Sequence, residues 1–200
     1  MKKFLRVVLA GGPASGKTET WHILAGEFLE LYTVSEAATL LINQFNLKPP
    51  LKGELKEAFW YACWRFQELA ERLGDAQALV LGKRGVLLDR ALADYAAYLE
   101  KGEEEFEEVT GLNFDEVFRR YSLVIFLGGP ESLDQLERVG SEGTVRLEES
   151  FEVNRELTKR TFLVWSRHPV FHFVPYLDDF EDKLNCVRRL VRGFLYPSNS

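Results

Sequence analysis

Cysteine, histidine and long apolar runs are scarce in this sequence. Only 2 cysteines occur among 200 residues, with no CxxC spacing, so a disulfide framework is not expected and a reducing compartment, the cytoplasm, is. No window reaches the roughly 18 apolar residues that a membrane-spanning helix needs. The apolar stretch at 4–10 is too short for a signal peptide and runs into glycines. We therefore expect no association with a membrane.

Basic residues are in the minority, with 25 Lys and Arg against 31 Asp and Glu and a formal net charge of -6. This balance argues against broad electrostatic binding to nucleic acid. The 3 histidines form no shared metal site, because His168 and His172 bracket Pro169 in an extended stretch. A hydrophobic fraction of 46% with 13% aromatic residues predicts instead one globular domain over residues 1–200.

Apolar runs that end at glycine, proline or an acid alternate with segments of helical periodicity. The predicted strands cover 4–10, 31–34, 85–89, 123–127 and 170–174. The predicted helices cover 17–31, 36–45, 54–81, 91–99, 114–121 and 178–195, with a further, glycine-interrupted helical segment at 132–167 and an acidic surface stretch at 100–108. This alternation predicts an α/β fold whose parallel sheet binds ligands at the carboxyl ends of its strands.

The clearest chemical signal is a phosphate loop, or P-loop (Walker A motif), between the first predicted strand and the first predicted helix. Its residues match GxxxxGK[ST] and are Gly11, Gly12, Pro13, Ala14, Ser15, Gly16, Lys17 and Thr18. Glycines let backbone N–H groups wrap a polyphosphate, and the helix start adds its dipole. Lys17 would reach the outer phosphates and Thr18 would coordinate Mg²⁺. The motif therefore predicts binding of ATP or GTP with Mg²⁺.

Two carboxylates and an arginine follow predicted strands. Asp89 ends an apolar strand and would hold Mg²⁺ together with Thr18, although a cap on the next helix is the alternative. Glu36 follows the second strand as a candidate general base for a substrate hydroxyl or water. Its alternative is a first-turn helix carboxylate beside a capping Ser35. Arg90 would meet a substrate anion or form a surface ion pair.

The order of these motifs resembles that in the small AAA-like P-loop ATPase/kinase family, which is similar to thymidylate kinases, deoxynucleoside kinases and nicotinamide riboside kinase domains. The resemblance spans nearly the whole chain. Its residues are the P-loop, Val34 to Thr39, Asp89 and Arg90 with Asp94 and Tyr98, Arg120 and Tyr121 before the strand at 123–127, Arg146 with Glu148, and Phe173 to Pro175. Two departures are Ser122, where many relatives carry Asp, and Ala91, where many carry Gly.

The resemblance implies a three-layer, nucleoside-kinase-like fold with a parallel five-stranded sheet in the order 2-3-1-4-5 and a helical lid at about 130–160. It implies that Glu36 is the base and that Asp89 and Arg90 form an acid–arginine pair beside the acceptor. Arg146 resembles the lid arginine, with Arg138 as a further candidate. Such arginines neutralise charge on the phosphoryl group in transfer.

The long predicted helix carries two neighbouring stripes. The first, expected to be core, consists of Phe59, Cys63, Phe66 and Ala70, and the second of Trp60, Trp64, Gln67 and Glu71. Trp64 would stack on a planar acceptor while Gln67 bonds its edge, as a Gln on this helix does in the similar nucleoside kinases. The alternative is ordinary packing of this stripe against Trp21 or Trp165.

These residues predict a Mg²⁺-dependent kinase that transfers the γ-phosphoryl of ATP or GTP to a hydroxyl or phosphate of a nucleoside-type or nucleotide-type small molecule. The alternative is a regulatory NTPase that switches a surface for a protein partner. The acidic balance disfavours a polynucleotide kinase. The expected partners are a nucleotide and a small-molecule acceptor, and a homodimer is left open. Dependence of nucleotide turnover on an acceptor separates the first two functions.

Overall fold

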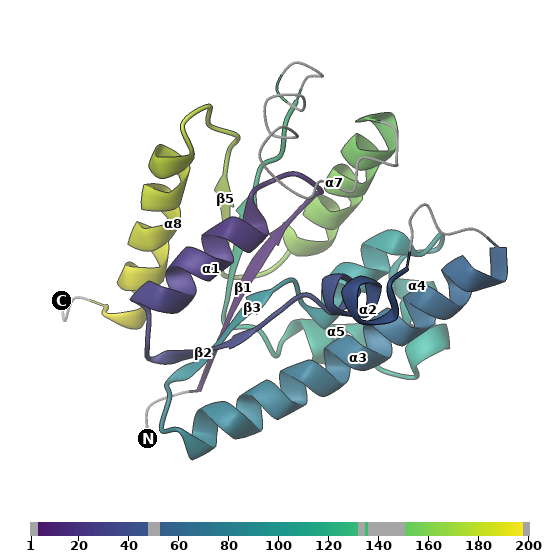
Figure 1. Cartoon of the computed structure of the whole chain (residues 1–200), viewed down its shortest axis with the longest axis horizontal. Coiled ribbons are helices and arrows are strands. Elements are labelled where there is room, and N and C mark those ends of the chain that lie inside the picture. Colours follow the sequence, from purple (N-terminus) through teal and green to yellow (C-terminus); the bar gives the residue numbers. More distant parts are fainter. Residues whose placement is uncertain (1–3, 48–52, 132–134, 136–150, 198–200) are drawn as a thin grey trace.

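A computed structural model describes residues 4–47, 53–131, 135 and 151–197. These residues form a five-stranded parallel sheet between two layers of helices (Figure 1). The strands are β1 (Leu5–Gly11), β2 (Leu31–Val34), β3 (Gly85–Asp89), β4 (Leu123–Leu127) and β5 (Phe171–Val174). Their order, β2-β3-β1-β4-β5, confirms the expected topology.

The described helices largely match the predicted segments. They are α1 (Lys17–Glu27), α2 (Ala37–Phe45), α3 (Gly53–Val80), η1 (Leu92–Tyr98), α4 (Glu103–Thr110), α5 (Phe114–Phe118), α7 (Phe151–Trp165) and α8 (Phe180–Leu195). The helix expected at 91–99 is the 3₁₀ helix η1, whose start is fixed by the Ala91 N–H donating to Asp94. The acidic stretch at 100–108 enters α4, which forms because its Phe106 is fully buried.

The apolar strands are covered on both sides, because successive side chains point to opposite faces. Val8 and Ala10 of β1 face a layer that includes α2, α3, η1 and α7. Val7 and Leu9 face α1 and α8, which lie together on the other side of the sheet (Figure 1). The register pairs Leu9 with Asp89, so the carboxyl end of β3 reaches the start of the P-loop.

The buried face of α3 differs from the predicted core stripe. Phe59 and Cys63 are buried as expected, but Phe66 is 38% exposed. The buried residues of this helix are Phe59, Cys63, Trp64, Gln67, Glu71, Gly74 and Ala78. Gly74 allows this face to approach the sheet, because a Cβ there would lie 2.4 Å from a methyl group of Val34. This buried face includes two polar side chains, those of Gln67 and Glu71.

Of the expected lid at about 130–160, residues 132–134 and 136–150 lie outside the described residues, and so do both candidate arginines, Arg138 and Arg146. The part that the structure describes consists of residues 130, 131 and 135 and of the start of α7, residues 151–160. Within the described ranges, no helix has the length and apolar character to cross a membrane.

Candidate nucleotide-binding site

The P-loop connects β1 to α1 in the conformation that its glycines permit. Gly16 has φ 75° at the N-cap of α1, a left-handed conformation that glycine adopts without steric cost. The Ser15 hydroxyl donates to Gly12 O at 2.9 Å. Lys17 Nζ donates to the same carbonyl at 2.6 Å and to Ser15 Oγ at 3.1 Å. Burial, and next the charge of Arg90, lower the pKa of Lys17 to about 7.

Two helices from the carboxyl-terminal part of the chain pack against this loop. A Cβ on Gly12 would lie 1.7 Å from Thr158 Oγ1 of α7, so only glycine fits there. Lys183 of α8 is buried, and its Nζ donates to Ser15 O at 3.0 Å and to Gly128 O at 2.7 Å. Burial lowers the pKa of Lys183 to about 8.

The sequence analysis did not find Lys183. The sequence pattern that could have identified it is its four-residue spacing on α8 with Val187, Val191 and Leu195, all of which are buried. This spacing places the lysine on the inner face of an amphipathic helix. A cation at such a position needs partners inside the protein, and the P-loop carbonyl of Ser15 is one of them.

Asp89 and Thr18 lie together at the amino end of α1. The Thr18 hydroxyl donates to Asp89 Oδ2 at 2.8 Å. Burial, and next the charge of Glu36, raise the pKa of Asp89. Its second oxygen, Oδ1, is buried and has no hydrogen-bond partner among the described residues. The alternative role as a helix cap does not hold, because the carboxylate of Asp94 accepts the Ala91 N–H at the start of η1.

Glu36 and Arg90 form an ion pair at the carboxyl ends of the strands, where the P-loop begins. Arg90 Nε lies 2.6 Å from Glu36 Oε1, and the two side chains are only 8% and 12% exposed. Arg90 Nη1 also donates to Gly11 O at 3.3 Å. The pair is buried, so the surface ion pair that was the alternative for Arg90 does not hold. Glu36 sits at the N-cap of α2, and its carboxylate accepts hydrogen bonds from Arg90 and Thr39.

The two acceptor-binding candidates on α3 are buried. Gln67 is 0% exposed, and its amide bonds to Ala37 N–H, Glu71 and Arg90 O. Trp64 is 4% exposed and Arg65 lies over its ring, which leaves little surface for stacking. The two tryptophans that the alternative proposed as packing partners of this stripe lie elsewhere. Trp21 belongs to the opposite layer, and Trp165 stacks on Phe118.

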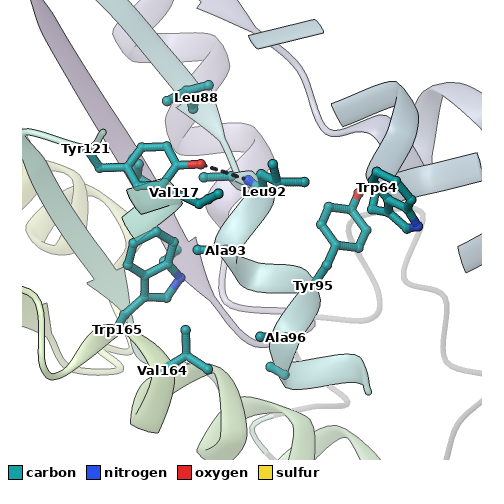
Figure 2. Close-up of a cluster of buried hydrophobic side chains, with 14 of the residues drawn as sticks. Trp64, Leu88, Leu92, Ala93, Tyr95, Ala96, Val117, Tyr121, Val164 and Trp165 are labelled. Carbon is teal, nitrogen blue, oxygen red and sulfur yellow. Dashed lines mark hydrogen bonds between the residues drawn. The ribbon is translucent and has the colours of Figure 1, made fainter. Parts of the chain in front are cut away.

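Two tyrosines of η1, Tyr95 and Tyr98, lie close to Arg90. Its guanidinium carbon lies 5.8 Å from the ring centroid of Tyr98, which packs on Trp60. Tyr95 points from η1 toward Trp64 (Figure 2). The Tyr95 hydroxyl and Trp64 Nε1 are buried and have no hydrogen-bond partner among the described residues.

Comparisons with known proteins agree with this architecture. A crystal structure of NadR protein in complex with NR has a TM-score of 0.68 at 16% identity, over 95% of this chain and 51% of that one. A second, of NadR protein in complex with NAD and AMP-PNP, has a TM-score of 0.63 at 18% identity, over 96% and 49%. The chain therefore spans about half the length of these proteins, and at such identities the likeness shows the fold alone.

No curated protein matches the sequence. The family described as "AAA domain" matches residues 6–182, which include the P-loop, Glu36, Asp89 and Arg90. Together with the sheet order and the fold of the NadR structures, this match confirms the expected P-loop kinase or NTPase fold and the nucleotide-binding class. The chain belongs to the AAA domain family of P-loop proteins.

Proposed function

We propose that the protein is a Mg²⁺-dependent kinase that transfers the γ-phosphoryl of ATP or GTP to a small nucleoside-type or nucleotide-type acceptor. The observation that carries this proposal is the ion pair of Glu36 and Arg90. It places a carboxylate, and a cation suited to anions, beside the P-loop carbonyl of Gly11. A loop that only bound a nucleotide would not need this pair.

The phosphate side of the proposed site consists of the P-loop, Lys17, Thr18 and Asp89. Asp89 Oδ1 and the Thr18 hydroxyl are the hard oxygen ligands that Mg²⁺ prefers, so these residues fit the ion. When bound, Mg²⁺ would neutralise negative charge on the phosphates. Lys17 would exchange its bond to Gly12 O for one to a phosphate oxygen.

The proposed transfer is an in-line displacement. The acceptor hydroxyl oxygen forms a bond to the γ-phosphorus while the bond from that phosphorus to the β–γ bridging oxygen breaks. The bond's electron pair leaves with the nucleoside diphosphate, and the hydroxyl proton passes to the carboxylate of Glu36. Arg90 orients that carboxylate and offsets charge on the transferred group. A phosphate acceptor would need no base and would be held by Arg90.

An aromatic acceptor fits the surroundings of Arg90. Tyr98 lies beside its guanidinium and packs on Trp60, and aromatic rings of this kind hold planar ligands by stacking. The Tyr95 hydroxyl and Trp64 Nε1 are buried polar groups without a hydrogen-bond partner among the described residues, and an acceptor would reach them only after these side chains move. The NadR complexes with NR and with AMP-PNP support an acceptor of the nucleoside type and a donor of the ATP type.

We further propose that residues 1–200 form one domain, that residues at about 130–160 close over the phosphates as a lid, and that Arg146, with Arg138 as the second candidate, acts there. The cytoplasm is the proposed location, in keeping with the free thiols of Cys63 and Cys186. A homodimer is the oligomer to test.

The first experiment is an assay of nucleoside diphosphate release with ATP, then GTP, and Mg²⁺. The acceptor panel contains nucleosides, nucleoside monophosphates and nicotinamide riboside, with a DNA and an RNA oligonucleotide as further arms. Turnover that rises with one small molecule and yields its phosphorylated form supports the kinase. Nucleotide binding or hydrolysis that no acceptor stimulates overturns it in favour of a regulatory NTPase with a protein partner.

A further inference from the structure

Gln67 of α3 connects the two residues of the ion pair through their backbones. Its Oε1 accepts the N–H of Ala37, the residue that follows Glu36, at 3.2 Å. Its Nε2 donates to the carbonyl oxygen of Arg90 at 3.4 Å. One fully buried amide therefore links the start of α2 to the segment after β3.

The orientation of this amide is fixed by its partners. The Nε2 group also donates to Glu71 Oε1 at 3.3 Å. In the reversed orientation Nε2 would face the Ala37 N–H, a second donor, and Oε1 would face a carbonyl and a carboxyl oxygen, which are acceptors. Only the observed orientation satisfies all three contacts.

Glu71, one turn further along α3, anchors the same segment. Its Oε1 accepts the Leu92 N–H at 2.7 Å, and its Oε2 accepts the Tyr121 hydroxyl at 3.1 Å. Figure 2 shows Tyr121 bonded to Leu92 as well. Arg90 itself has φ 65°, which is strained for a residue that is not glycine. Such a conformation persists when the surroundings determine it. Here the Arg90 N–H donates to Leu9 O of β1, while α3 bonds to the Arg90 carbonyl and to the Leu92 N–H that follows.

We propose that Gln67 is a positioning residue that holds Glu36 and Arg90 in the relative placement needed for phosphoryl transfer, acting through Ala37 N–H and Arg90 O. The inference rests on the proposed function of Glu36 and Arg90. It explains why α3 keeps a polar amide in its buried face, where an apolar side chain would be the ordinary choice. We expect nucleotide binding to depend little on this bridge, because the direct contacts of Gln67 are to Ala37, Glu71 and Arg90 and none is to a P-loop residue.

The test compares Gln67→Leu with Gln77→Leu, since Gln77 lies on the same helix but is exposed. We expect Gln67→Leu to lower the kcat of acceptor phosphorylation by about 10- to 100-fold, because a small misplacement of reacting groups has this effect. Its nucleotide Kd stays within about threefold of wild type, and so do kcat and Kd of Gln77→Leu. Unchanged kcat in Gln67→Leu would overturn the proposal.

Gln67→Glu supplies a readout that lost packing would not change. When protonated, the new carboxyl can still accept the Ala37 N–H and donate toward Arg90 O, and when ionised it repels Glu71. We expect its kcat relative to wild type to rise as pH falls from about 8 to about 6. A kcat ratio of Gln67→Glu to wild type that does not change with pH counts against the proposal. Because Gln67→Glu keeps the size of the side chain, it tests the proposal even if Gln67→Leu does not fold.

A third readout needs no turnover. In protein labelled with ¹⁵N-arginine, the Nε–Hε signal of Arg90, identified by its loss in Arg90→Lys, reports the bond to Glu36. We expect this signal to shift and its exchange with solvent to speed up in Gln67→Leu, but not in Gln77→Leu. If no acceptor stimulates the wild type, the proposed function fails while this signal still tests the bridge. If the wild type is active and the signal is unchanged, only the bridge fails.

Discussion

Arg90 joins Glu36 to the P-loop, since one guanidinium bonds both to the carboxylate, at 2.6 Å, and to Gly11 O, at 3.3 Å. The proposed base and the phosphate-binding loop are thus fixed to each other by a single cation. A change at any of these three residues should therefore affect a definable step, and the variants below separate nucleotide binding, chemistry and stability.

Glu36→Gln tests the base. The amide keeps the shape of the side chain but cannot take up the hydroxyl proton, so we expect acceptor-dependent kcat to fall by about 10²- to 10⁴-fold. The nucleotide Kd should stay within about threefold of wild type, because the hydrogen bonds shown for the Glu36 carboxylate come from Arg90 and Thr39, which are not P-loop residues. Steady-state kinetics and nucleotide titration measure the two quantities. Glu116→Gln, an exposed change on α5, is the control, and full activity of Glu36→Gln would refute the assignment.

Lys17→Met tests the phosphate contact. Methionine keeps the length of the side chain and its apolar part but removes the cation, so we expect nucleotide affinity to fall by about 10- to 100-fold, the worth of one charge-assisted bond. Calorimetric titration measures the change. Lys56→Met, on the exposed face of α3, should bind as the wild type does. Equal affinities of the two variants would remove Lys17 from the site.

Asp89→Asn tests the metal site. Chelation of Mg²⁺ with EDTA should abolish turnover, and Asp89→Asn should raise the Mg²⁺ concentration for half-maximal activity by at least about tenfold, because a carboxylate is a stronger ligand than an amide. Rates measured across a Mg²⁺ titration show both effects. The exposed Asp115→Asn serves as the control. A Mg²⁺ requirement that is the same in all three proteins would contradict the assignment.

Gly12→Ala tests the contact between the P-loop and α7. The new methyl group would lie 1.7 Å from Thr158 Oγ1 and 2.6 Å from Thr158 Cβ. We expect the unfolding free energy to fall by about 1–3 kcal/mol and nucleotide affinity to fall with it. Adding Thr158→Ala should restore only part of the loss, because Cβ remains. Gly26→Ala, which meets nothing within 4 Å in α1, should instead raise stability by about 0.5–1 kcal/mol in urea unfolding.

Glu71→Gln tests the buried carboxyl. Burial raises the pKa of Glu71 from 4.5 to about 7. The folded protein then retains a proton that the unfolded chain releases, so the stability contributed by this group falls as pH rises from 4.5 to about 7 and is constant above. We expect the unfolding free energy of wild type, relative to Glu71→Gln, to fall by about 3 kcal/mol across this window. Urea unfolding at a series of pH values measures it. A difference that does not vary with pH would contradict the burial of this charge.

The strands and the P-loop were predictable from local sequence. Buried parallel strands are continuous apolar runs, and the strands at 31–34, 85–89 and 123–127 have the predicted bounds. The P-loop needs glycine at fixed positions, which a sequence displays directly. Glu36, Asp89 and Arg90 could be placed near one another because the carboxyl ends of parallel strands share one edge of the sheet.

The interior polar groups were not predictable in the same way. Gln67 and Glu71 resemble surface residues of an amphipathic helix until the backbone groups of Ala37, Arg90 and Leu92, far away in sequence, provide their partners. The buried face of α3 was therefore misassigned by about one residue position. The 3₁₀ form of η1 likewise depends on a tertiary setting that local propensity does not contain.

The central strand of this sheet is synthesised before either of the strands that pair with it. The ribosome delivers β1 first, yet β1 lies between β3 and β4, which begin only at Gly85 and Leu123. The nascent chain must keep an apolar strand unpaired meanwhile, which exposes it to aggregation and slows folding. The loop after β1 then acquires its bond from Lys183 to Ser15 O only when α8 has docked. We therefore expect the nascent chain to gain its nucleotide-binding loop late, after α8 has been synthesised and has docked.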